Sequence, residues 1–377
     1  MTNFPLLKLP AVALHEVMKM MMPNEIFKLS MCSFQIESLL RCRKYKANRL
    51  DIHLSHSDPQ FDIYCSDGSK SIIRFSSTNN DSLEGPVRKL EQLSGRYIKE
   101  DSTSIYLTHT TLGEMFDIHQ NLIRIFAFPD AGWILYNNKL NFKQFCQSFY
   151  QIILTTDFSK FTVLGDYLGL KVLENLMDEL PTTKSLVIGS WISSQFKHSN
   201  ALQYLNSHYT HAHWVRLDHL YCIRNVDTAK LERTNLNCYD LNKFLRYWVD
   251  CEEFMLRRLD IRLKDGTVYD EAVITDQLTT VSNHDNGYPQ IFIKSKGTKC
   301  VVGCLKLRET FAEFTTWDPE EFSQEYQILE IICRRKELED GIRKIRDSSQ
   351  EKKKLELEAL EKLLTEKLAE INKPLVV

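Results

Sequence analysis

Histidines gather in one stretch of this sequence, at His208, His211, His213 and His219, with Asp218 beside the last. Histidines two residues apart on a strand, or three apart on a helix, can share a face and bind a metal ion. A defined metal site needs a further ligand pair such as Cys-x2-Cys, or an HExxH motif, and the sequence has neither. We therefore expect surface or half-buried histidines here and predict no metal site.

The ten cysteines are scattered, and most lie in apolar patterns. Cys300 and Cys304 lie in an alternating pattern that places both on one face of a strand, but no second pair completes a zinc site. No basic segment followed by an apolar core and a small-residue cleavage site opens the sequence. Free thiols then indicate a reducing compartment, and we expect an intracellular protein, cytoplasmic, nuclear or both.

Motifs for catalysis and cofactor binding are missing from the sequence. It contains no GxxxxGK or GxGxxG phosphate loop and no GxSxG nucleophile motif, and no carboxylate pair stands out. We predict no catalytic residues and no cofactor, and favour a non-catalytic chain. An uncharacterised enzyme with a site in residues 47–263 remains an alternative.

The charge pattern indicates neither nucleic-acid nor membrane binding. The formal net charge is −2, and the triplet Lys352-Lys353-Lys354 is flanked by Glu351 and Glu356, which is typical of a solvated helix face. The longest apolar run, 122–136, is interrupted by charged residues and a proline, so no membrane-spanning helix is expected.

The first forty residues predict two or three short helices that end near Arg43. Their apolar residues recur at helical spacing, and Pro23-Asn24 divides the pattern because proline cannot continue a helix. A segment of this size buries too little surface to be stable alone. Several apolar side chains are therefore expected to contact a partner or the next domain.

This segment resembles an F-box. The resemblance is carried by Leu6, Leu9-Pro10, Val17, Met21, Pro23, Ile26, Leu29, Ser30 and Cys32-Ser33, while Phe34 stands near the position where the family usually has tryptophan. The resemblance implies a three-helix domain at residues 1–46 that docks on the Skp-type adaptor of a cullin-RING ubiquitin ligase. It also implies which side chains bind the adaptor: Leu6, Leu9, Pro10, Val17, Met21, Pro23, Ile26 and Leu29.

The middle of the chain mixes strand and helix patterns. Alternating residues over 49–76, with a turn at Asp67-Gly68, predict an antiparallel meander. Helical spacing predicts helices over 112–126, 142–153, 173–180 and 201–209, and further strands are expected at 104–107, 186–188, 214–217, 259–263, 290–294, 300–306 and 311–315. Strand-like units near 187, 216, 230 and 261 suggest irregular leucine-rich-repeat-like units.

The most distinctive stretch, 236–248, looks like the type 2 F-box associated domain when taken together with 259–261. In that family the F-box is followed by a module that faces the substrate, and the resemblance covers about 49–317. We assign residues 47–317 to this domain. Within the stretch, Leu241, Phe244, Leu245 and Trp248 form one helix face, which predicts core packing.

Residues 318–377 predict a long charged helix that begins with Asp318 as N-cap and Pro319 at its first position. Apolar residues at steps of three, four or seven form two partial heptad blocks between 320 and 372. The pattern leaves two outcomes open, a short coiled coil with self-association through 320–372 or a solvated single helix.

These patterns together predict an α+β (mixed α/β) protein: a three-helix F-box, a strand/helix domain with irregular leucine-rich-repeat-like units, and a long C-terminal helix. The resemblance implies a substrate-recognition subunit of an SCF-type ubiquitin ligase, with a Skp-type adaptor, a cullin scaffold and an unknown target protein as partners. An adaptor-independent scaffold that acts through the C-terminal helix is the first alternative.

Overall fold

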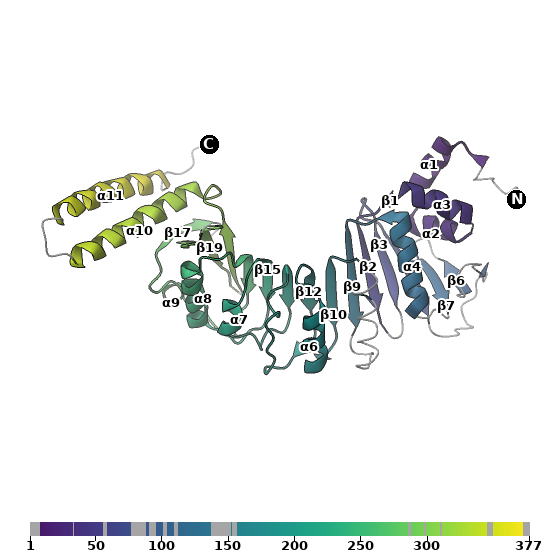
Figure 1. Ribbon diagram of the computed structural model, residues 1–377, viewed down its shortest axis with the longest axis horizontal. Helices are drawn as coiled ribbons and strands as arrows, with labels where there is room; N and C mark the ends of the chain where they lie inside the picture. The colour runs from purple at the N-terminus through teal and green to yellow at the C-terminus, as the bar shows by residue number, and fades with distance from the viewer. Residues whose placement is uncertain are drawn as a thin grey trace. The chain divides into compact units, whose positions relative to one another are not determined.

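A computed structural model describes residues 8–32, 34–55, 59–76, 88–89, 96–100, 104–108, 112–136, 152, 157–285, 288–297, 299–309, 311–344 and 350–371. The chain divides into two compact units, Met1–Trp191 and Ile192–Val377 (Figure 1). Both units combine helices with β-strands, which confirms the predicted mixed α+β class. For reference, we call the strands of the first unit the first sheet and those of the second unit the second sheet.

Three short helices open the first unit, as predicted: α1 (Ala11–Lys19), α2 (Pro23–Cys32) and α3 (Phe34–Arg43). Pro23 is the first residue of α2, where its missing N–H costs no hydrogen bond. The carboxylate of Glu25 accepts a hydrogen bond from the backbone N–H of Met22 at 2.8 Å, which closes the start of α2. Apolar side chains from all three helices form their common core: Leu14, Met18, Ile26, Phe27, Met31, Ile36 and Leu40.

The predicted meander forms the middle of the first sheet. Strands β2 (Arg49–Leu54), β3 (Gln60–Tyr64) and β4 (Lys70–Ser76) pair antiparallel, and Gly68 in the β3–β4 turn adopts φ +83°. On one side β2 pairs parallel with β9 (Asp130–Tyr136), which continues into the parallel strands β10 (Lys160–Leu164) and β12 (Ser185–Ile188). On the other side follow β7 (Ser104–Thr108), β6 (Arg96–Glu100) and β5 (Arg88–Lys89).

Helix α4 (Leu112–Ile125) confirms the helix predicted over 112–126. It contacts α3, and its Phe116 and His119 rings both lie 5.4 Å from the Trp133 ring of β9. The two-residue strands β1 (Tyr45–Lys46) and β8 (Phe126–Ala127) pair beside it. After β11 (Tyr167–Leu168), helix α6 (Leu170–Glu179) buries Leu173, Leu176 and Met177, as its spacing predicted. The helix predicted over 142–153 lies outside the described residues except for Ile152.

The second unit begins at β13 (Trp191–Ile192) and contains three parallel strands: β14 (Asn206–Tyr209), β15 (Val226–Leu231) and β16 (Leu256–Ile261). Their connections carry α7 (Leu217–Tyr221) and α8 (Cys238–Asp250). Two expectations are wrong here. Residues 201–209 end in strand β14 rather than forming a helix, and the strand predicted at 214–217 is absent because Arg216 is the N-cap of α7.

Four antiparallel strands complete the second sheet. Strand β20 (Ala312–Trp317) pairs with β16, and β19 (Val302–Leu307), β18 (Tyr288–Lys294) and β17 (Thr280–Asp285) follow in order, after the short helix α9 (Glu271–Ile274). Three of these strands were predicted, and β17 was not. A Cβ atom at Gly303 would lie 2.7 Å from the Phe314 ring and 2.9 Å from the Trp248 ring, so α8 can approach β19 and β20 closely only with glycine there.

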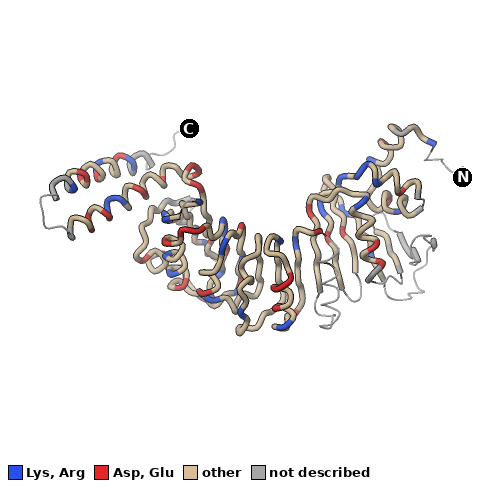
Figure 2. Tube along the Cα trace, viewed as in Figure 1, with Lys and Arg blue, Asp and Glu red and all other residues tan. Residues whose placement is uncertain are grey.

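The C-terminal region is helical, as predicted, but it forms two helices, α10 (Ser323–Lys344) and α11 (Gln350–Ile371), which contact each other (Figure 1). The N-cap prediction is wrong. Asp318 and Pro319 precede α10, and the Asp318 carboxylate accepts a hydrogen bond from the backbone N–H of Cys300 at 3.2 Å. Arg334 of α10 pairs with Glu356 of α11 at 3.0 Å, and Figure 2 shows charges of both signs interspersed along the two helices.

Helix α10 belongs to the core of the second unit. Its Leu329 packs with Phe292, Val302 and Cys304 of β18 and β19, and Tyr326 covers the edge of this cluster. Among the described residues, no helix is both long and apolar enough to cross a membrane.

Candidate functional site

The three N-terminal helices leave apolar side chains uncovered. Val12 and Met20 are 75% and 80% exposed, and Pro10 is exposed beside them. Uncovered side chains of this kind on a folded helical domain indicate a contact surface. We call Pro10, Val12 and Met20, with the half-buried Leu9, Val17 and Met21, the N-terminal apolar surface.

The predicted adaptor-binding residues divide into three groups. Leu9, Pro10, Val17, Met21 and Leu29 are exposed or half-buried, so they are accessible to a partner. Pro23 and Ile26 are buried within the helices, which places them in the core. Leu6 lies outside the described residues.

The sequence did not single out Val12 and Met20 for binding. Both are apolar residues of the first predicted helix, and neither belongs to the set that the F-box resemblance implied for adaptor binding. The buried residues Leu14 and Met18 define the inward face of the helix, and Val12 lies outside that face. An apolar residue outside the buried face is the signal that would have identified Val12 as a contact residue.

A cavity of about 490 Å³ lies beside this surface, between the helices and the first sheet. Its apolar lining includes Met18, Ile26, Tyr45 and Phe126, and the Tyr45 hydroxyl donates a hydrogen bond to the sulfur of Met18 at 3.0 Å. Burial raises the pKa of Tyr45, which keeps that hydroxyl protonated as a donor. Met20, Met21 and Met22 also line it, and thioether side chains adapt to irregular space.

A polar network crosses the first sheet. His53 Nε2 and Lys70 Nζ lie 2.9 and 2.8 Å from Asp62 Oδ2, and the Tyr136 hydroxyl lies 3.2 Å from His53 Nδ1. Burial would raise the pKa of Asp62, but hydrogen bonds from His53 and Lys70 outweigh it and hold that pKa below its usual range. An imidazole between a carboxylate and a hydroxyl can relay a proton. Burial raises the pKa of Tyr136, so its hydroxyl stays protonated at neutral pH.

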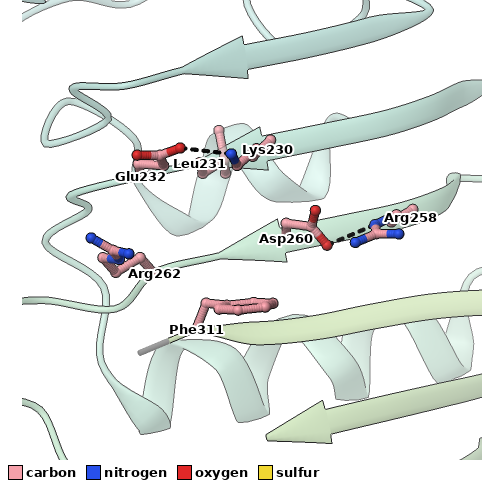
Figure 3. Close-up of a pocket in the computed structure, with 7 residues that line it drawn as sticks. All are labelled: Lys230, Leu231, Glu232, Arg258, Asp260, Arg262 and Phe311. Atoms are coloured by element: carbon pink, nitrogen blue, oxygen red, sulfur yellow. Dashed lines mark hydrogen bonds and ion pairs between the residues drawn. The ribbon is translucent and has the colours of Figure 1, made fainter. Parts of the chain in front are cut away.

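A second polar surface lies on the sheet of the second unit. Side chains alternate along its strands, so Ala229, Leu231, Leu259 and Ile261 are buried on one face. The other face carries Lys230, Arg258 and Asp260, with Glu232 and Arg262 just after the strands. These polar residues, with Leu231 and Phe311, line a cavity of about 320 Å³ (Figure 3). We call this the second-unit polar face.

The histidine run is spread over several local contacts. His208 Nε2 lies 3.0 Å from Glu232, and His211 Nδ1 lies 3.4 Å from Arg233. His219 Nδ1 accepts a hydrogen bond from the backbone N–H of Arg216. Burial lowers the pKa of His219, so the ring is neutral when it accepts this bond. In the described part of the chain, no three His, Cys, Asp or Glu side chains are arranged to hold a metal ion.

The two cysteines singled out by the sequence are buried thiols. Burial raises the pKa of Cys304 to about 12 and also raises that of Cys300, so both remain protonated at neutral pH. Cys300 lies before β19, with φ +48°, rather than within the strand.

Comparisons with known proteins identify the N-terminal helices. Residues 6–47 match the family model described as "F-box domain". A Caenorhabditis elegans protein named "Skn-1 dependent zygotic transcript 15 protein" is 22% identical over 282 residues, which cover 69% of this chain and 80% of that protein. No solved structure matches the chain. The helices α1 to α3 therefore belong to an F-box domain.

Proposed function

We propose that this chain is a substrate-recognition subunit of an SCF-type ubiquitin ligase. The observation that carries the proposal is the N-terminal apolar surface, which lies within the segment that matches the F-box model. In this proposal that surface docks on a Skp-type adaptor held by a cullin scaffold inside the cell. Burying one valine or methionine side chain contributes about 1.5–3 kcal/mol, so Val12 and Met20 would supply a substantial part of the binding energy.

Residues 47–317 would hold the target protein as a type 2 F-box associated domain. Its irregular leucine-rich-repeat-like units, expected near residues 187, 216, 230 and 261, would correspond to β12, β15 and β16. Residue 216 caps α7 and contributes no strand. The ligase would then act by proximity, because tethering a target beside a charged ubiquitin carrier raises its effective concentration. The chain itself would supply no catalytic group.

The first prediction tests the N-terminal apolar surface. Val12→Asp and Met20→Asp place a charge where apolar contact with the adaptor is expected. Each should weaken binding of purified Skp-type adaptor about tenfold or more, measured by calorimetry on the full chain. Leu9→Ala/Pro10→Ala should weaken it as well.

Val268→Asp is the matched control, because Val268 is 84% exposed and belongs to the second unit. It introduces the same charge at a similarly exposed valine and should leave adaptor binding unchanged. A wild-type chain that binds no adaptor would refute the ligase proposal. Such a result would favour the adaptor-independent scaffold, for which the exposed Leu355 of α11 offers a contact. For the alternative of an enzyme in 47–263, the network around His53 and Asp62 is where chemistry would be sought.

A further inference from the structure

The second-unit polar face has an internal charge pattern that can be followed residue by residue. The cavity is lined by three cations, Lys230, Arg258 and Arg262, and by two carboxylates, Glu232 and Asp260. Lys230 Nζ lies 2.8 Å from the Glu232 carboxylate, and Arg258 Nε lies 2.8 Å from that of Asp260. Each carboxylate therefore already has a cationic partner.

The flanking charges are also balanced. Glu313 of β20 lies 3.6 Å from the Arg258 guanidinium and 3.9 Å from that of Arg308, whose guanidinium stands 5.7 Å from the centre of the Phe311 ring. His208, which belongs to the neighbouring strand β14, lies 3.0 Å from the Glu232 carboxylate. These contacts fix the positions of the paired charges before any partner arrives.

Arg262 is the exception. Among the residues that the structure describes, its guanidinium makes no ion pair, and its Nε is buried without a hydrogen-bond partner. Figure 3 shows dashed contacts for Lys230–Glu232 and Arg258–Asp260 and none for Arg262. A buried donor that lacks a partner costs free energy, and a partner that supplies the acceptor recovers it. The lining thus has one surplus positive charge, located at Arg262.

We propose that the second-unit polar face binds an acidic segment of the target protein, with one carboxylate side chain paired to the Arg262 guanidinium and an apolar neighbour in that segment resting on Phe311. This inference depends on the proposed function in one respect, which is that the acidic segment belongs to the target protein of the ligase. A single surplus charge matches a carboxylate, whereas a phosphate dianion is usually held by a cluster of arginines. The planar guanidinium donates two parallel hydrogen bonds to a carboxylate, so the pair is directional.

The experiment selects peptides from a random phage-displayed library on the full-length protein and measures the affinity of the enriched peptides. We expect enrichment in Asp and Glu, and an affinity loss of about tenfold or more in Arg262→Ala, because one partner of a partly buried charge pair has been removed. Changing the peptide's acid to its amide should cause the same loss. No enrichment, no acidic bias, or unchanged affinity in Arg262→Ala would overturn the proposal.

Arg257→Ala is the matched control, because Arg257 lies in β16, the strand that Arg262 directly follows. Arg257 is exposed, pairs with Asp227 at 3.9 Å and does not line this cavity. It should bind the peptides as the wild type does. Arg262→Glu should lose the acidic peptide and gain binding of the same peptide with lysine at that position, which separates a charge contact from damage to the fold. A phosphoserine version that binds tighter than the carboxylate would refute the carboxylate assignment.

The two proposals fail separately. Arg262→Ala should still bind the adaptor, and Met20→Asp should still bind the selected peptides. A wild-type chain that binds the selected peptides but not the adaptor would refute the proposed ligase function. The same result would leave the proposed acidic-segment site supported.

Discussion

His119 is buried completely in α4, and neither of its ring nitrogens has a hydrogen-bond partner among the residues that the structure describes. Its ring lies against Trp133, and this burial lowers its pKa to about 4. The helical pattern of the sequence placed His119 correctly on the apolar face with Phe116. Its low pKa is caused by burial, and part of that burial comes from Trp133 of β9, which helical spacing within α4 does not relate to His119.

The second prediction follows from this neutral histidine. The unfolded chain takes up a proton near the ordinary histidine pKa of 6.5, while the folded chain does so only near 4. Stability should therefore fall as the pH decreases from 6.5 towards 4, by up to about 3 kcal/mol. His119→Leu should remove this slope from urea unfolding curves recorded across that range. His198→Leu serves as a control at a half-buried histidine, and an unchanged slope in His119→Leu would contradict the assignment.

At the scale of elements, α8 is the helix that the sequence specified best. Leu241, Phe244, Leu245 and Trp248 are all buried, as their spacing predicted. Its true N-cap is Asn237, whose side chain accepts a hydrogen bond from the Asp240 N–H at 3.1 Å, while the Asp240 carboxylate accepts one from the Asn237 N–H. The sequence offered Thr234, Asn235, Asp240 and Asn242 as possible caps and did not single out Asn237, because residues of all these types can cap a helix.

The third prediction tests this cap. Asn237→Ala should lower the free energy of unfolding by about 1 kcal/mol, because the N–H of Asp240 loses its acceptor. Asn237→Ser should retain most of the stability, since serine also accepts this bond. Equal stability of the alanine variant and the wild type in chemical denaturation would show that the cap contributes nothing.

Strand β14 shows why other elements were missed. Asn206-Ser207-His208-Tyr209 has little intrinsic strand preference, and its extended form comes from pairing with Thr228 to Leu231 of β15. Asp318 and Pro319 form a standard helix-start pattern, but the Asp318 carboxylate is engaged by the Cys300 N–H instead. In both cases a contact distant in sequence overrides the local signal.

At the scale of the whole molecule, the sequence predicted boundaries near residues 46 and 317, whereas the chain divides into two compact units after Trp191. The sequence also treated the region after Trp317 as an appendage. The structure places Leu329 of α10 in the same cluster as Phe292 and Val302. The heptad blocks were visible in the sequence. Their pairing within one chain depends on where α10 ends and α11 begins, and apolar spacing does not encode those positions.

The fourth prediction uses this division. A chain that ends after Lys344 should keep both its adaptor affinity and its melting temperature close to those of the full chain. A chain that ends after Trp317 should keep adaptor affinity but melt at a lower temperature, because Leu329 no longer covers β18 and β19. Calorimetry with adaptor and thermal scans test both. Loss of adaptor affinity in the Lys344 truncation would show that α11 supports the N-terminal helices.

Helix α11 packs mainly on α10, where its half-buried side chains include Leu357 and Leu360, and its backbone hydrogen bonds are those within a helix. Such a helix can open without unfolding the sheet, so its amides should exchange with deuterated water faster than those of β19. Exchange in α11 would then report local opening, and exchange in β19 would report global unfolding. A single exchange experiment would therefore measure the free energies of both processes.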